Sequence, residues 1–418
     1  MDKLEIMKSN NLKGNVRISG SKNAVLPIIA ASILTKENCY IEDVPDLTDV
    51  KSMKDILVNI GVEVNWDKKN KILDVKADEI KSTDMTCEDI GQKIRASVLM
   101  LGPMLAREGK AKICMPGGCV IGNRPIDLHI KGLTALGADI SIEHGYIEAT
   151  ADKLIGTKIY LDFPSVGATE NIMMAAVRAV GKTIVENVAV EPEIVDLANF
   201  LVKMGADIKG AGTDTIIIKG VPKLQGIKYQ IIPDRMEAGT FMIAAAITGG
   251  DITIENVILD HINPIIAKLE ESNVTIEVID DKIRVKSNGK LKAVDITTLP
   301  FPGFPTDMQA PFMALMSIAE GTSVIVETIF ENRFMHVGEL TKMGANAKVE
   351  GRSCVVVGVE ELMGANVCAS DLRAGMALLL AGLCAEGKTI INDMKYIERG
   401  YEDVVEKFVA IGANIKKY

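Results

Sequence analysis

The chain has 418 residues, too many for one ordinary hydrophobic core and enough for two or three domains. Apolar residues make up 48% of it and charged residues 25%, a balance that excludes a disordered protein. The net charge of -9 argues against a general nucleic-acid or membrane surface, although a local basic pocket remains possible. The N-terminus lacks an apolar signal region, and the longest apolar run, 374–385, is too short to span a bilayer. We therefore expect a cytoplasmic protein without a membrane segment.

One short sequence pattern recurs along the chain: an apolar residue, then Gly, then Ala or, in the first copy, Val. Its central residue stands at Gly61, Gly137, Gly205, Gly344 and Gly412, and a degenerate copy is centred on Asn273. The spacing is about 70 residues throughout, which predicts six repeated units.

The units share one order of predicted elements. In chain order, buried helices of small apolar residues are expected at 24–34, 238–247 and 374–385, strands at 183–188 and 252–257, and an amphipathic helix at 194–204 with short strands at 206–209 and 215–219. Gly205 is the expected stop of that amphipathic helix. We therefore predict an α/β protein of six small subdomains, arranged as two domains of three.

The arginines are few and stand at repeated places. The chain has 11 arginines against 36 lysines. Lys22, Arg95, Arg235, Asp307 and Arg373 precede the first helix of a unit, and Arg124, Arg333 and Arg399 precede a second helix. Arginine suits bidentate binding of carboxylate or phosphate, and helix N-termini favour anions. The pattern predicts a site for a polyanionic small molecule between two domains, with structural ties to loop carbonyls as the alternative.

Two further segments each contain a candidate catalytic residue. Cys119 follows Pro-Gly-Gly in a predicted loop, five residues before Arg124, and a neighbouring cation favours a reactive thiolate. Asp307 follows a stretch rich in proline, 300–305, and opens a predicted helix. Taken alone, Asp307 is better explained as a helix N-cap than as a general base.

Together these segments resemble the enolpyruvyl transferases over essentially the whole chain. The motifs that carry the resemblance are 20–24 (Gly-Ser-Lys-Asn-Ala), 95–97 (Arg-Ala-Ser), 116–129, 304–307 (Phe-Pro-Thr-Asp), 331–333 (Glu-Asn-Arg) and 398–400 (Glu-Arg-Gly). The resemblance implies two inside-out α/β barrel domains of three repeats each. It also implies a discontinuous first domain, residues 1–21 plus 233–418, and a second domain, 22–232, which carries the Cys119 loop. The active site would lie in the cleft between them.

The motifs resemble most the members of the family that act on a nucleotide sugar. The implied reaction transfers enolpyruvyl from phosphoenolpyruvate to the 3-hydroxyl of UDP-N-acetylglucosamine and releases phosphate, by addition and elimination through a tetrahedral ketal. This is the first committed step of peptidoglycan synthesis, and no metal or organic cofactor is implied. These two small molecules are the expected partners, without nucleic acid or membrane insertion.

The resemblance also carries roles over to particular residues. Cys119 would be the general acid and the thiol that fosfomycin alkylates, Asp307 the base, and Lys22 a further catalytic residue. Lys22, Arg124, Arg333, Arg373 and Arg399 would bind phosphoenolpyruvate. The nucleotide-sugar contacts would be Asn23, Arg95, Arg124, Pro125, Ile126, Asp127, Leu128, His129, Ser165, Val166, Gly167, Asp307 and Ile329.

Two alternatives stay open. The shikimate-pathway enolpyruvyl transferase shares the fold and the donor but lacks the Pro-Gly-Gly-Cys loop, and Asn23 after Ser21-Lys22 favours the nucleotide-sugar enzyme. A non-catalytic ligand-binding relative would be favoured by loss of Cys119, Asp307 or several arginines, all of which are present. Leu99 stands where many relatives have Trp, so packing near the nucleotide can differ.

Overall fold

The computed structural model of the protein describes residues 3–85, 95–115 and 126–418. Contacts divide the described chain into two compact units. The first, here called the split unit, comprises residues 3–19 and 233–418. The second, the inserted unit, comprises the described residues between 20 and 232. Each unit has a hydrophobic core of its own.

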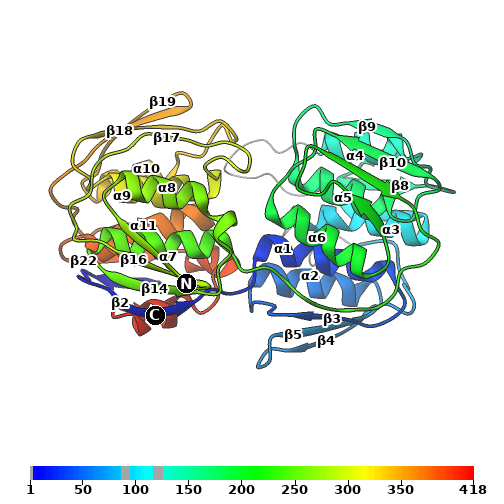
Figure 1. The fold of residues 1–418 in the computed structure, drawn as a ribbon, viewed down its shortest axis with the longest axis horizontal. Coiled ribbons are helices and arrows are strands. Elements are labelled where there is room, and N and C mark those ends of the chain that lie inside the picture. Colours follow the sequence, from blue (N-terminus) through cyan, green and yellow to red (C-terminus); the bar gives the residue numbers. More distant parts are fainter. Residues whose placement is uncertain (1–2, 86–94, 116–125) are drawn as a thin grey trace. The chain divides into compact units, whose positions relative to one another are not determined.

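The inserted unit contains three sheets around buried helices (Figure 1). Its helices are α1 (Lys22–Ala31), η1 (Ser32–Leu34), α2 (Thr48–Asn59), η3 (Arg95–Met100), α3 (Leu101–Glu108), α4 (Asp127–Ala135), α5 (Val166–Ala176) and α6 (Pro192–Lys203). Its strands are β3 (Cys39–Glu42), β4 (Glu63–Asp67), β5 (Ile72–Lys76), β6 (Lys110–Cys114), β7 (Asp139–Glu143), β8 (Tyr146–Thr150), β9 (Lys158–Tyr160), β10 (Lys182–Glu186), β11 (Asp207–Lys209), β12 (Thr215–Lys219) and β13 (Lys228–Gln230). The sheet orders are β13-β3-β5-β4, β6-β8-β7 and β11-β12-β10-β9.

The split unit repeats this plan. Its helices are α7 (Arg235–Ile247), η4 (Leu259–His261), α8 (Asn263–Glu271), η5 (Thr306–Met308), α9 (Gln309–Met316), α10 (His336–Lys342), α11 (Leu372–Cys384), η6 (Met394–Arg399) and α12 (Val404–Ala410). Its strands are β1 (Leu4–Met7), β2 (Lys13–Arg17), β14 (Asp251–Glu255), β15 (Thr275–Ile279), β16 (Lys282–Lys286), β17 (Ile296–Thr297), β18 (Thr322–Val326), β19 (Asn346–Glu350), β20 (Ser353–Val357), β21 (Asn366–Cys368), β22 (Lys388–Asn392) and β23 (Asn414–Lys417). The sheet orders are β15-β16-β14-β2, β17-β18-β20-β19 and β21-β22-β1-β23.

The repeat is visible in the pairing of strands. β10 pairs in parallel with β9 and antiparallel with β12, which pairs antiparallel with β11. In the same way, β18 pairs in parallel with β17 and antiparallel with β20, which pairs antiparallel with β19. Together with the six sheets that the described residues form, this confirms the prediction of repeated α/β subdomains in two groups of three.

The core of the split unit is built on helices that are apolar on every side. α7, α9 and α11 pack against one another, and nearly all of their residues are buried. A helix without a polar face is stable only when other elements surround it, which explains why the sheets lie outside the helices. Among the described residues, the longest apolar helices fall short of the length needed to cross a membrane.

The charged residues at the first helices lie one or two positions later than the sequence predicted. Lys22 and Arg235 are the first residues of α1 and α7, and Arg373 is the second residue of α11. The residues outside these helices are caps whose side-chain oxygens accept backbone N–H groups, namely Ser21, Asp234 and Asp371. The charged side chains therefore belong to the first helical turn.

Candidate active site

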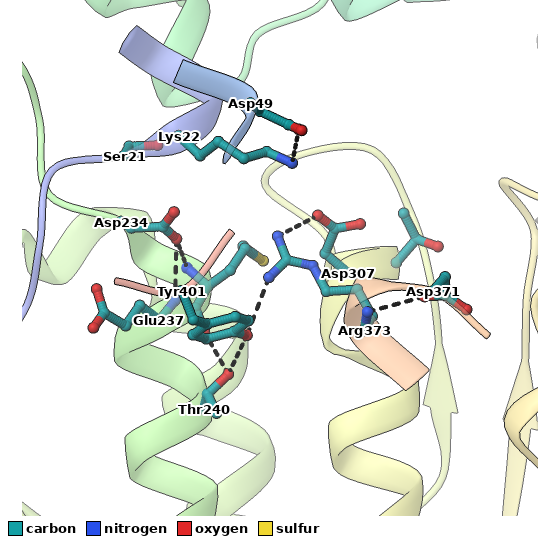
Figure 2. A network of polar contacts seen from close by, with 12 residues as sticks. Ser21, Lys22, Asp49, Asp234, Glu237, Thr240, Asp307, Asp371, Arg373 and Tyr401 are labelled. Carbon is teal, nitrogen blue, oxygen red and sulfur yellow. Dashed lines mark hydrogen bonds and ion pairs between the residues drawn. The ribbon is translucent and has the colours of Figure 1, made fainter. Parts of the chain in front are cut away.

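In the split unit, one carboxylate lies between two buried arginines. Asp307 is on η5, at the entrance to α9, and its Oδ1 accepts from Arg333 Nη2 at 2.7 Å. Its Oδ2 accepts from Arg373 Nη2 at 2.8 Å (Figure 2). Arg333 precedes α10, Arg373 lies in the first turn of α11, and each arginine is only 5% exposed. Three segments distant in sequence thus place two cations and one anion in one cluster.

The positive charges of the two arginines control the ionisation of Asp307. Burial by itself would raise the pKa of Asp307, but the charges of Arg373 and Arg333 outweigh burial and hold that pKa well below its ordinary range. Asp307 is therefore a carboxylate at neutral pH, and the cluster carries a net positive charge. Its side chain makes no helix-capping hydrogen bond, so the N-cap explanation of Asp307 is wrong.

Another acidic residue, which is buried and which the sequence did not reveal, orders the surroundings of Arg333. Glu327 is fully buried at the end of β18 and accepts from the hydroxyls of Thr298 at 2.9 Å and Thr306 at 2.8 Å. It also accepts the backbone N–H of Ile329 at 2.9 Å, so the predicted contact residue Ile329 lies in a turn that Glu327 fixes. The Thr306 hydroxyl in turn accepts from Arg333 Nη1 at 2.9 Å.

Arg399 is positioned by the packing of its neighbour. It is the last residue of η6, and a Cβ added to Gly400 would lie 2.5 Å from Leu372 Cδ2. Leu372 is the first residue of α11, next to Arg373. Glycine at 400 therefore lets the segment that carries Arg399 lie directly against the start of α11.

In the inserted unit, Lys22 is paired with Asp49. The Lys22 ammonium lies 3.2 Å from Asp49 Oδ2, and the two side chains are 16% and 5% exposed (Figure 2). Asp49 is in the first turn of α2, where the helix dipole favours a carboxylate. Asn23, the next residue of α1, is exposed. The sequence did not mark Asp49, because an acidic first turn is common in helices that have no functional role.

A buried histidine and the start of α5 form another group in the inserted unit. Asn171 Nδ2 donates to the carbonyl oxygen of Val98 and lies 2.8 Å from His129 Nδ1, and Asn171 Oδ1 accepts the backbone N–H of Gly102. This pattern makes His129 Nδ1 an acceptor, so the ring hydrogen is on Nε2. A Cβ at Gly167 would lie only 3.2 Å from that nitrogen.

The charge state of His129 follows from its surroundings. Burial, with a smaller contribution from the positive charge of Arg95, lowers the pKa of His129 to about 4, so the ring is neutral at physiological pH. Ser165 caps α5, and Ser165, Val166 and Gly167 are partly exposed. The first N–H groups of a helix have no partners within it and attract anions.

The remaining predicted residues divide between the start of α4 and the part of the chain outside the described residues. Ile126 caps α4 and is buried, Asp127 is exposed in its first turn, and Leu128 packs partly against the core. Cys119, Arg124 and Pro125 lie outside the described residues. The structure therefore groups Asp307, Ile329, Arg333, Arg373 and Arg399 within the split unit, and Lys22, Asn23, Arg95, His129 and 165–167 within the inserted unit.

The fold and these residues define a class of protein. Residues 6–408 match the family described as EPSP synthase (3-phosphoshikimate 1-carboxyvinyltransferase), and the chain belongs to that family of enolpyruvyl transferases. It is 60% identical, over 99% of both chains, to UDP-N-acetylglucosamine 1-carboxyvinyltransferase 1 of Caldanaerobacter subterraneus subsp. tengcongensis. It is 55% identical to UDP-N-acetylglucosamine 1-carboxyvinyltransferase 2 of Carboxydothermus hydrogenoformans, over 100% of this chain and 99% of that one. The crystal structure of the enolpyruvyl transferase NikO from Streptomyces tendae is similar with a TM-score of 0.90 at 25% identity, covering 100% of this chain and 98% of that one.

Proposed function

We propose that the protein transfers the enolpyruvyl group of phosphoenolpyruvate to the 3-hydroxyl of UDP-N-acetylglucosamine and releases phosphate. The observation that carries the proposal is the pair of buried arginines, Arg333 and Arg373, whose Nη2 atoms converge on one carboxylate. A donor that carries both a carboxylate and a phosphate needs such fixed cations. The relatives at 55–60% identity are named for this transfer.

The proposed reaction has two steps. In the addition, the sugar 3-oxygen bonds to C2 of the donor, its proton goes to a base, and an acid protonates the C3 methylene to give a tetrahedral ketal. In the elimination, C3 loses a proton and the C2–O bond to phosphate breaks, which restores the double bond. We propose Cys119 as the acid at C3 and Asp307 as the base for the sugar hydroxyl.

Asp307 can act as a base only after its ion pairs with the two arginines are broken. While both arginines hold its pKa low, the carboxylate accepts protons poorly. We propose that the donor carboxylate replaces Asp307 on Arg333 and Arg373. Burial then acts on Asp307 without their compensation and raises its pKa toward the range of an effective base. Donor binding would thus precede activation of the sugar hydroxyl.

Other residues are proposed to hold the two substrates. Lys22, Arg124 and Arg399 would bind the phosphate, and Arg399 would share the carboxylate with Arg333 and Arg373. For the nucleotide sugar, the first turn of α5 offers backbone N–H groups, and neutral His129 lies beside Gly167. The further proposed contacts are Asn23, Arg95, Arg124, Pro125, Ile126, Asp127, Leu128, Ser165, Val166, Asp307 and Ile329. The proposal requires residues of both units to act on the same substrates.

The proposal extends to the role of the protein in the cell. The product commits the sugar nucleotide to peptidoglycan, and thereby to cell-wall synthesis, cell shape and division. Both substrates are cytoplasmic, so we place the enzyme there. Fosfomycin is expected to alkylate Cys119.

Phosphate release tests this proposal. We expect release only when phosphoenolpyruvate and UDP-N-acetylglucosamine are both present, with one phosphate for each enolpyruvyl sugar detected by mass spectrometry. Shikimate 3-phosphate replaces the nucleotide sugar in the matched control and should give background release. Equal release with shikimate 3-phosphate would assign the alternative enzyme, and no release with either acceptor would favour a non-catalytic relative.

A further inference from the structure

The two terminal nitrogens of the Arg373 guanidinium have different partners. Nη2 faces Asp307, whereas Nη1 donates to the hydroxyl of Tyr401 at 3.1 Å (Figure 2). The guanidinium carbon also lies 5.6 Å from the centre of the Tyr401 ring. Tyr401 is 3% exposed, so its hydroxyl acts where water does not compete for the hydrogen bond.

The hydrogen-bond pattern fixes the direction of the Tyr401 hydroxyl. Thr240, fully buried on α7, donates its only hydroxyl hydrogen to the carbonyl oxygen of Met236 at 2.9 Å. Its oxygen lies 2.7 Å from the Tyr401 hydroxyl, and donation from Tyr401 to Thr240 is the arrangement that gives both hydroxyl hydrogens an acceptor. The Tyr401 oxygen remains free to accept from Arg373, which can only donate. In this arrangement Arg373 donates to Tyr401, and Tyr401 donates to Thr240.

The same side chain secures the segment that carries Arg399. Tyr401 follows Arg399 by two residues, and Gly400 between them packs on Leu372 at the start of α11. The bond from Tyr401 to Thr240 joins this segment to α7, and its bond to Arg373 joins it to α11. One hydroxyl therefore restrains two of the three arginines that are proposed to hold the donor carboxylate.

We propose that Tyr401 and Thr240 are positioning residues that hold the Arg373 guanidinium in place when the donor carboxylate replaces Asp307. The inference rests on the proposed function. The two contacts of Arg373 have separate tasks: Nη2 exchanges one carboxylate for another, while Nη1 keeps its neutral partner throughout. Tyr401 does not touch the donor in this scheme and acts through Arg373.

Tyr401→Phe tests the inference because it removes the hydroxyl and keeps the ring. We expect the KM for phosphoenolpyruvate to rise about ten- to a hundredfold, the range for a lost hydrogen bond to a charged group. The KM for UDP-N-acetylglucosamine should stay within about twofold, and kcat should fall less than the donor KM rises, because the Arg373 charge remains.

A pair of variants at Thr240 tests the acceptor of the Tyr401 hydroxyl hydrogen. Thr240→Val removes the acceptor of the Tyr401 hydrogen and should raise the donor KM, by less than Tyr401→Phe does. Thr240→Ser keeps the hydroxyl, so its KM for phosphoenolpyruvate should be close to that of the unsubstituted protein. If Tyr401→Phe does not fold, as judged by near-ultraviolet circular dichroism, this pair still decides the question.

Tyr229→Phe is the matched control for losing a buried tyrosine hydroxyl. The Tyr229 hydroxyl lies 2.5 Å from an Asp196 carboxylate oxygen, and within the described residues its hydrogen bonds go to atoms of Asp196. This variant should alter the thermal midpoint and leave the donor KM unchanged. An unchanged donor KM in Tyr401→Phe, an equal rise in Tyr229→Phe, or equal donor KM values for Thr240→Val and Thr240→Ser would overturn the inference. Failure of the proposed function is distinguished because the unsubstituted protein would then show no donor-dependent turnover.

Discussion

Two histidines stay neutral because each is buried close to an arginine of the site. Burial is the main cause that lowers the pKa of both His129 and His336 to about 4. Arg95 adds to this effect at His129, and Arg333 adds to it at His336, where Asp371 opposes it. A protonated ring at either place would add a cation beside an arginine that is already positive. Because burial lowers the pKa of both histidines, we expect the free energy of unfolding to fall as the pH is lowered.

This sensitivity has a definite sign. An unfolded histidine titrates near pH 6.5, so between pH 6.5 and 4 the unfolded chain binds more protons than the folded one, and lowering the pH favours unfolding. The loss of stability begins below pH 6.5, is complete near pH 4, and amounts to about 2 kcal/mol per histidine at pH 5. We expect His336→Gln to show a smaller difference in unfolding free energy between pH 7.5 and 5 than the unsubstituted protein, measured by urea denaturation.

The exposed His144 supplies the control, and His144→Gln should keep the full difference. Buried acids whose pKa is raised, such as Asp196 at about 6, contribute with the opposite sign. Both histidine variants keep these acids, so the contribution of the acids cancels when the pH dependences of the two variants are compared. Equal pH dependence in His336→Gln and His144→Gln would contradict the prediction.

At the scale of elements, the repeat is fixed by close backbone contacts as well as by helix stops. Gly220 follows β12 and Gly358 follows β20, at equivalent places in the two units. A Cβ at Gly220 would lie 1.6 Å from the carbonyl oxygen of Ala179, and one at Gly358 would lie 1.7 Å from that of Ala319. The sequence marked a different set of glycines, such as Gly344, which has a φ of +93° after α10. The repeated Gly-Ala pattern marks the helix stops, but it does not mark the glycines that contact a distant carbonyl.

The contact at Gly358 predicts a selective loss of stability. In Gly358→Ala the new methyl group overlaps the Ala319 carbonyl oxygen, so the strand end and the helix end must move apart. We expect the unfolding free energy to fall by about 1–3 kcal/mol, measured by urea denaturation. Gly338→Ala is the control, because nothing lies within 4 Å of a Cβ there and the residue is within α10. Alanine at 338 should stabilise the helix by up to about 1 kcal/mol, and a similar loss in both variants would refute the argument.

At the scale of the whole molecule, the first residues of the chain complete the last sheet. β1 lies between β22 and β23, with Leu4 opposite Ile391 and Lys417. β2 pairs in parallel with β14 at the edge of another sheet of the split unit. Along the sequence, the inserted unit thus falls between the two segments that form the split unit, and it has its own core.

This arrangement predicts that damage to β1 is confined to one unit. Ile6 is fully buried in the split unit, and Ile6→Asp places an unpaired charge in that core. We expect hydrogen exchange to accelerate across 233–418 while amides of the inserted unit stay protected. Glu5→Gln, on the opposite side of the strand, removes the charge that pairs with Lys388 at the surface and should change neither unit. Equal loss of protection in both units would show that they fold as one.

The sequence by itself determined the repeated α/β plan, the buried helices and the arginines at their starts. These follow from spacing, apolar periodicity and residue type, all of which are local properties of the chain. It missed the partners of those arginines and, without the family resemblance, favoured a helix cap for Asp307, while Cys119, Arg124 and Pro125 stay predictions. Only the tertiary structure placed Asp307 between Arg333 and Arg373 and joined Tyr401 to Thr240. Such contacts join residues from 26 to 161 positions apart, and a distance of that kind is set by how the helices and sheets pack.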